Sequence, residues 1–210
     1  EDLGSLREEV GLTTRKDGFI LNNRFIIPVL DIDNRLSTMI GYYPDFKKYI
    51  TISTPFFSKN NMFFNFRQAY ELSWSKFNGV VFLVEGIFDC LSLRSIGLPA
   101  IATMGSTVDA EKGELLKLFR KVIAIPDGDK VGYQALDRYT KKGWKVPSNT
   151  VMVRFIGTSL DLNGTKVKIK DMDDFVKLYE AEDVINTLLS FADSKEEIEL
   201  IQEYSRKIGE

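Results

Sequence analysis

Histidine is absent from this chain of 210 residues, and cysteine occurs once, at Cys90. A single cysteine cannot form a disulfide within the chain, and a chain without histidine cannot assemble a Cys/His zinc site or a Ser-His-Asp triad. Cys90 lies in an apolar stretch, so we expect it to be a buried small residue. Any catalysis by this chain would therefore depend on carboxylates and metal ions.

Long apolar runs are also missing. No run reaches the roughly 18 residues that a membrane-spanning helix needs, and no signal-peptide pattern is present. We therefore expect a cytoplasmic protein that does not enter a membrane. The first residue is Glu1 rather than Met, so we expect a domain excised from a longer protein. The 210 residues, 44% of them apolar, are enough for one large α/β domain or two small ones.

Charge is almost balanced over the chain, with 28 basic and 30 acidic residues and a net charge of −2. It is not evenly distributed, because the segment 12–78 carries nine Lys or Arg against five Asp or Glu, and the rest of the chain carries the acidic excess. A mildly basic part beside a part with clustered acids suits a protein that holds a polyanion near metal ions.

The central feature is a run of five apolar residues, Val80 to Val84, followed by Glu85 and Gly86 and then by Asp89. Such a run is typical of a strand buried on both faces, in the middle of a parallel sheet. Ligands in open α/β sheets bind outside the carboxyl ends of the strands, so Glu85 is placed for chemistry. The alternative is that Glu85 caps the following helix, with Asp89 in its first turn.

The remaining pattern predicts an α/β protein, with a mainly parallel sheet flanked by helices and a small α+β lobe before it. Two apolar stretches around Asp33-Asn34 predict an antiparallel hairpin, in which Pro28 favours an edge strand or a bulge. Residues 44–62 predict a loop-rich surface segment. From residue 80 onward strands alternate with helices, which favours a parallel, doubly wound sheet. The predicted strands are 25–31, 35–43, 80–84, 100–102, 121–129 with its acidic end, and 150–156; the predicted helices are 1–11, 65–76, 87–96, 109–119, 131–142, 170–179, 182–191 and 195–208.

Acidic residues occur in pairs where predicted strands end or helices begin. The pairs are Glu85/Asp89, Asp127/Asp129 and Asp171/Asp173. A parallel sheet brings these segments to one edge, where like charges repel unless a cation compensates. Oxygen ligands of this kind suit Mg²⁺, and two such ions can serve phosphoryl transfer. Asx-turns and helix caps are the alternative explanation of each pair taken alone.

The arrangement resembles the TOPRIM domain shared by bacterial-type (DnaG-like) primases, topoisomerases and some nucleases. The glutamate motif matches VEGIFD (84–89), the D-x-D motif matches DGD (127–129), and the third acidic motif matches DMDDF (171–175). Two longer segments, 84–106 and 126–136, are similar to the primase versions of these motifs. Upstream, the segments 24–43 and 47–57 are together similar to the N-terminal lobe of the primase RNA-polymerase core. Met172 stands where the family usually has proline, a departure that matters little to metal geometry.

The resemblance covers roughly residues 10–180 and implies the catalytic core of a DNA primase. Such an enzyme is a DNA-directed RNA polymerase that makes short RNA primers on single-stranded DNA from ribonucleoside triphosphates, by metal-dependent nucleotidyl transfer during replication. It implies two or more Mg²⁺ or Mn²⁺ ions, with Glu85 acting on or near them as a general base. The implied metal ligands are Glu85, Asp127, Asp129, Asp171 and Asp173, with Asp89 in support, and the implied phosphate-binding residues are Arg24, Lys47, Lys48 and Lys130. Taken alone, each of these basic residues is better explained as a solvated charge on the surface.

We expect a basic N-terminal lobe at 1–78, a TOPRIM catalytic domain at 79–180 and C-terminal helices at 181–210. The resemblance also implies a replicative helicase and a zinc-binding module as partners outside this chain. Two alternatives remain open: a TOPRIM-type metal-dependent nuclease, and a non-catalytic module that only binds nucleic acid. A cellular, a phage and a plasmid source are all compatible with the sequence.

Overall fold

The computed structural model describes residues 14–15, 18–19, 24–46, 48–52, 62–128, 134, 144–154, 159–162, 165–193 and 198–199. The chain forms two compact units, Glu1–Ser58 and Lys59–Glu210. The predicted helices 1–11 and 131–142 lie outside the described residues, apart from residue 134. In the described part of the chain no helix has the length and apolar character to cross a membrane.

The smaller unit contains a three-stranded antiparallel sheet in the order β3-β4-β5, with β3 at Phe25–Leu30, β4 at Leu36–Tyr43 and β5 at Lys48–Thr51. The predicted hairpin is confirmed: Asn34 turns the chain with φ 66°, and Asp31 Oδ1 accepts hydrogen bonds from the backbone N–H of Asp33 and Arg35 at 2.9 Å each. Pro28 lies on the edge strand β3, which also carries a register shift between Val29 and Leu30.

The prediction of a loop around residues 48–51 was wrong, because these residues form β5. The sequence Lys-Tyr-Ile-Thr is short, but it pairs with β4 along its whole length, and the rings of Tyr42 and Tyr49 meet across the strands at 4.9 Å. A short 3-10 helix, η1 (Pro44–Phe46), joins β4 to this segment. A separate two-stranded sheet pairs β1 (Thr14–Arg15) with β2 (Gly18–Phe19).

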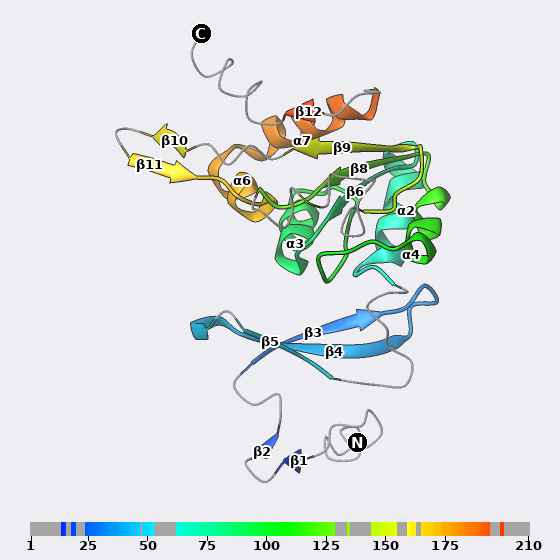
Figure 1. Cartoon of the computed structure of the whole chain (residues 1–210), viewed down its shortest axis with the longest axis vertical. Helices are drawn as coiled ribbons and strands as arrows, with labels where there is room; N and C mark the ends of the chain where they lie inside the picture. Colours follow the sequence, from blue (N-terminus) through cyan, green and yellow to red (C-terminus); the bar gives the residue numbers. More distant parts are fainter. Residues whose placement is uncertain are drawn as a thin grey trace. The chain divides into compact units, whose positions relative to one another are not determined.

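The larger unit is built on a five-stranded sheet in the order β12-β9-β8-β6-β7, in which all neighbouring strands are parallel (Figure 1). The strands are β6 (Val80–Val84), β7 (Ala100–Ala102), β8 (Lys121–Ile125), β9 (Thr150–Arg154) and β12 (Ile198–Glu199). All five residues of β6 are buried, as expected for a strand with neighbours on both sides. The predicted parallel sheet is therefore confirmed.

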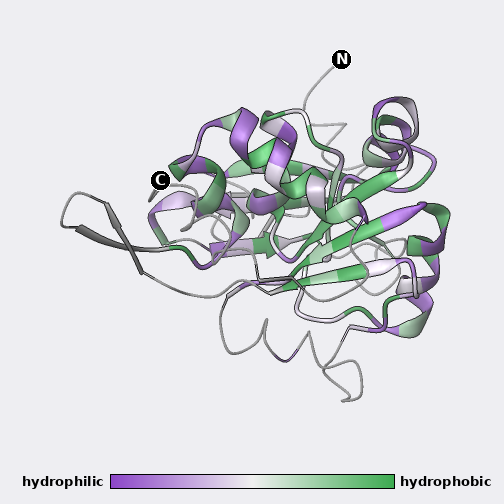
Figure 2. Ribbon diagram, turned by 90° about the horizontal axis from the view of Figure 1, so that it is seen from above, coloured by the Kyte–Doolittle hydropathy of each residue, from purple (hydrophilic) through white to green (hydrophobic). Residues whose placement is uncertain are grey.

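Helices cover this sheet, and Figure 2 shows the hydrophobic residues concentrated along its strands. The α-helices are α2 (Phe66–Lys76), α3 (Ile87–Ser95), α4 (Ala110–Glu114), α6 (Met172–Leu178) and α7 (Ala181–Ser190). Two 3-10 helices, η2 (Leu115–Leu118) and η3 (Phe191–Asp193), follow α4 and α7. The strands β10 (Ser159–Leu162) and β11 (Thr165–Lys168) form a separate antiparallel hairpin. One face of the sheet, including Val81, Leu83 and Val122, packs with Phe66 of α2 and the buried Trp144 in one apolar cluster.

Three of the predicted helices differ from the structure in their continuity, their type or the unit in which they pack. Helix 109–119 is not continuous, because α4 gives way to the 3-10 helix η2 at Leu115. Of the predicted helix 195–208, the structure describes only Ile198–Glu199, and these residues form a strand because they pair with β9 at the free edge of the sheet. Helix α2, which the sequence analysis placed in the N-terminal lobe, contacts β6 and β7 and packs within the larger unit.

Candidate active site

Three hydrogen bonds join the three acidic segments, two of which follow the parallel strands β6 and β8, while the third begins α6. Glu85 Oε1, just after β6, accepts from the backbone N–H of Asp127, just after β8, at 3.2 Å. The N–H of Gly128 donates to the carbonyl of Lys170 at 2.6 Å. Asp89 Oδ1 accepts from the N–H of Asp173 at 2.9 Å. Because β6 and β8 are adjacent and parallel, residues about 40 positions apart in sequence meet at one edge.

Glu85 lies between the end of β6 and the start of α3 and does not cap the helix. The N-cap residue of α3 is Gly86, which has no side chain that could cap that helix end. The carbonyl of Glu85 accepts hydrogen bonds from the N–H of Met104 at 3.2 Å and from Thr103 Oγ1 at 3.3 Å. The side chain is thus held by β8 and the main chain by the segment after β7, so the carboxylate is fixed at the strand end.

Asp89, in the first turn of α3, is almost fully buried, with 6% of its surface exposed. Burial raises its pKa to about 6; the nearby charges of Asp171 and Asp173 add to the rise, while hydrogen bonds from the backbone N–H groups of Asp173 and Gly86 act against it. A Cβ at Gly86 would stand 2.3 Å from Asp89 Oδ2, so a larger residue here would displace that carboxyl oxygen. Asp89 therefore connects the start of α3 to the start of α6.

Asp171 and Asp173 differ in their surroundings although they are two residues apart. Asp171 is the N-cap of α6 and accepts from the N–H of Asp174 at 2.9 Å, and partial burial raises its pKa. Partial burial acts to raise the pKa of Asp173 too, but hydrogen bonds from Lys177 and Ser92 and the charge of Lys177 outweigh it, so the pKa is lowered. The Ser92 hydroxyl donates to Asp173 Oδ1 at 2.6 Å, and Lys177 Nζ donates to Oδ2.

Ser92 and Lys177 were missed by the sequence analysis. Lys177 follows Asp173 by four residues, the spacing of an ion pair on one helix face, and this signal was available. Ser92 follows Asp89 by three residues and so lies on the same side of α3, but its contact with Asp173 depends on how α3 packs against α6.

The carboxylate oxygens at this edge suit a hard divalent ion such as Mg²⁺ or Mn²⁺. In the ranges that the structure describes, no three acidic, Cys or His side chains converge tightly enough to form a complete ion site. Glu85 and Asp127 are adjacent, and Asp129 lies outside the described residues. Asp89 already accepts from the main chain of Asp173, so its geometry favours support of the site rather than direct ligation.

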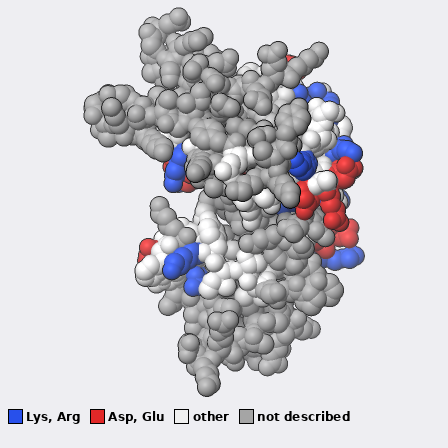
Figure 3. All heavy atoms as spheres, in the orientation of Figure 1, with Lys and Arg blue, Asp and Glu red and all other residues white. Residues whose placement is uncertain are grey.

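The predicted basic residues that are described lie in the smaller unit. The guanidinium of Arg24 stands over the ring of Tyr43, 5.3 Å from its centroid, and Tyr43 is the cross-strand partner of the exposed Lys48. These contacts bring Arg24 and Lys48 to the same end of the three-stranded sheet, where Figure 3 shows Lys and Arg atoms near β5. Lys47 and Lys130 lie outside the described residues.

Comparison with known proteins agrees with this geometry. Residues 82–176 match the Toprim-like family, and Toprim domains generally bind divalent metal ions. A crystal structure of the Aquifex aeolicus primase, comprising its zinc-binding and RNA polymerase domains, superposes with a TM-score of 0.63 and 25% identity over 88% of this chain and 44% of that chain. The chain is similar to DnaG primases, and its residues 82–176 are similar to Toprim-like domains. A DnaG primase catalytic domain bound to single-stranded DNA has the same fold, with a TM-score of 0.61 and 20% identity over 90% of this chain and 61% of that chain.

A curated relative is the DNA primase of Clostridium acetobutylicum, which is 27% identical over 180 residues. The match covers 80% of this chain but only 27% of the relative, so the chain spans about a quarter of that primase. The matched range 82–176 contains Glu85, Asp89, Asp127 and Asp173, which take part in the hydrogen bonds between the acidic segments, and it also contains Asp171.

Proposed function

We propose that this chain is the catalytic core of a DNA primase, which synthesises short RNA primers on single-stranded DNA during replication. The observation that carries the proposal is the set of hydrogen bonds that joins the three acidic segments at one edge of a parallel sheet. A DNA template and ribonucleoside triphosphates as substrates imply that the protein works in the cytoplasm.

The proposal assigns a role to each acidic residue. Glu85, fixed at the end of β6, acts on or near the metal site and takes the proton of the primer 3′ hydroxyl. Asp127, Asp129, Asp171 and Asp173 hold Mg²⁺ or Mn²⁺, with two or more ions in the complete site. When bound, these ions activate the attacking oxygen and stabilise the leaving one. Asp89 supports the site by holding the main chain at Asp173.

The smaller unit binds the template strand in this proposal. Arg24 and Lys48 supply positive charge for phosphates at one end of the β3-β4-β5 sheet, and Lys47 precedes Lys48 in the sequence. Tyr49 is 49% exposed, and so presents an aromatic face on which a base can stack. Lys130 follows the D-x-D loop and meets nucleotide phosphates. A replicative helicase and a zinc-binding module outside this chain complete template selection.

Glu85→Gln tests the catalytic proposal, because it keeps the shape of the side chain and removes its charge and basicity. We expect loss of ribonucleotide incorporation on a single-stranded template in Mn²⁺, with an unchanged circular dichroism spectrum. Glu180→Gln is the matched control, since Glu180 is exposed and makes no cap hydrogen bond, and it should retain activity. Template degradation without incorporation would point to a nuclease, and neither activity, even with a zinc module and helicase added, would leave a binding module.

The double change Lys47→Ala, Lys48→Ala tests the template surface. Each lost phosphate contact should weaken binding of a fluorescent single-stranded oligonucleotide and lower the slope of log affinity against log salt by about 0.7. Lys76→Ala, on the exposed end of α2, is the control. An unchanged affinity and an unchanged slope in the double variant would place the template elsewhere.

A further inference from the structure

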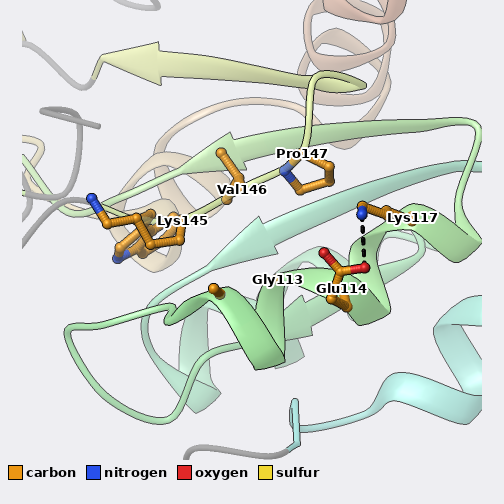
Figure 4. Close-up of a pocket in the computed structure, with 8 residues that line it drawn as sticks. Gly113, Glu114, Lys117, Lys145, Val146 and Pro147 are labelled. Carbon is orange, nitrogen blue, oxygen red and sulfur yellow. Dashed lines mark hydrogen bonds and ion pairs between the residues drawn. The ribbon is translucent and has the colours of Figure 1, made fainter. Parts of the chain in front are cut away.

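Lys112 is the only lysine among the described residues that is buried, with 1% of its surface exposed. It lies in α4, where its N–H donates to the N-cap carboxylate of Asp109 at 2.8 Å. The next residue, Gly113, packs directly under the carbonyl of Lys145, and a Cβ there would stand 2.0 Å from that oxygen (Figure 4). The helical turn that carries Lys112 is therefore fixed in place on both sides.

The buried ammonium group has a defined target. Lys112 Nζ donates to the carbonyl of Thr103 at 2.7 Å, and it stands over the ring of Phe63, 4.7 Å from the centroid. Burying an ammonium group costs several kcal/mol unless it is well hydrogen-bonded, so a buried lysine needs a compensating role. A methionine or leucine would fill the same space without that cost.

Thr103 links Lys112 to the candidate active site. Its N–H donates to the carbonyl of Val84 at 3.0 Å, and its hydroxyl contacts the carbonyls of Glu85 and Gly105. The following residue, Met104, adopts φ 59°, a left-handed conformation that non-glycine residues rarely adopt, and its N–H also donates to the carbonyl of Glu85. Thr103 and Met104 thus hold the backbone of Glu85, and Lys112 in turn holds Thr103.

The far end of the same segment is anchored as well. Trp144 Nε1 donates to the carbonyl of Ser106 at 3.2 Å, and the N–H of Lys145 donates to the carbonyl of Val108 at 2.7 Å. Between these anchors, Gly105, Ser106 and Thr107 are exposed beside the carboxyl end of β6 and β7. The left-handed turn at Met104 persists because the anchors on either side over-determine it.

We propose that Lys112 is a positioning residue, whose buried ammonium holds the Thr103–Ser106 segment and, through it, the main chain of Glu85. This inference rests on the proposed function, because it assigns the segment to the same acidic site. Lys112 does not touch substrate or metal in this view; it acts by fixing the Thr103 carbonyl.

Lys112→Met keeps the volume of the side chain and removes the donor. Loss of a hydrogen bond made directly to a metal ligand typically costs 10–100-fold in metal affinity. Lys112 acts one contact further out, so we expect the low end of that range, a Kd for Mn²⁺ about tenfold higher, measured by electron paramagnetic resonance of free Mn²⁺. Lys117→Met is the matched control: Lys117 is exposed, pairs with Glu114 at the surface (Figure 4), and should leave the Kd unchanged. In a Trp74→Phe background, Trp144 is the one remaining tryptophan, and its emission should shift in Lys112→Met but not in Lys117→Met.

Thr103→Val gives a second test that does not depend on the folding of Lys112→Met. It removes the hydroxyl contacts with the Glu85 and Gly105 carbonyls while keeping the carbonyl that Lys112 binds. We expect a Kd for Mn²⁺ higher by several-fold in this variant. If wild-type protein binds Mn²⁺ but Lys112→Met and Thr103→Val bind it equally well, Lys112 is only structural and the inference fails. If wild-type protein binds no Mn²⁺, the proposed function fails instead.

Discussion

Asp89 gives the sharpest test of the electrostatics of the site. At neutral pH its buried carboxyl must ionise in surroundings that raise its pKa from 3.8 to about 6. That rise corresponds to about 3 kcal/mol of free energy, which is an upper limit for the cost of the charge in the absence of metal. Asp89→Asn keeps an oxygen that can accept from the N–H of Asp173 and removes the charge. We therefore expect the variant to be more stable than wild type at pH 7 in EDTA.

The raised pKa determines the sign of the stability difference between Asp89→Asn and wild type, and the pH range over which it changes. The protonated Asp89 carboxyl stabilises the folded state relative to the ionised one. This stabilisation is fully present below about pH 4 and is lost as the pH rises through about 6. Urea unfolding of both proteins from pH 4 to 8 should therefore show a stability difference that is near zero at the acidic end and grows to as much as about 3 kcal/mol. Asp183→Asn, at an exposed position in α7, should show no such growth. A difference that is constant with pH, or that favours wild type at pH 7, would refute the argument.

Three further predictions follow from packing, hydrogen bonding and charge. Gly113→Ala should destabilise the protein by about 1–3 kcal/mol, because the new Cβ would meet the carbonyl of Lys145 at 2.0 Å, whereas Gly105→Ala has open space and should change the urea midpoint little. Ser92→Ala should cost about 1–2 kcal/mol, measured in the same way, because Asp173 loses a charged hydrogen bond. Millimolar Mn²⁺ should raise the melting temperature, since the ion relieves repulsion among the carboxylates; an unchanged melting temperature would count against a shared site.

The fold of the larger unit was predicted well because its signals are local. Val80–Val84 is apolar at every position, which is the mark of a strand with both faces covered, and the structure buries all five residues. The hairpin before it was also predicted, because Asp33-Asn34 has the chemistry of a tight turn. Two of the errors came at β5 and β12, where short segments become strands only because a neighbouring strand offers hydrogen bonds.

The residues of the candidate site show the same difference between local and long-range signals. The contact between Glu85 and Asp127 could be expected from the sequence, because both residues follow strands of a parallel sheet, whereas Asp173 was singled out by its motif at the start of a helix. The sequence could not indicate that Ser92 meets Asp173, which is 81 residues away, or that Lys112 turns inward to the Thr103 carbonyl while Lys117 stays at the surface. Periodicity encodes which residues form a strand or helix, but side-chain partners far apart in the chain depend on the angle and register at which those elements pack. The tertiary structure alone therefore decided which polar groups hold the acidic residues in place.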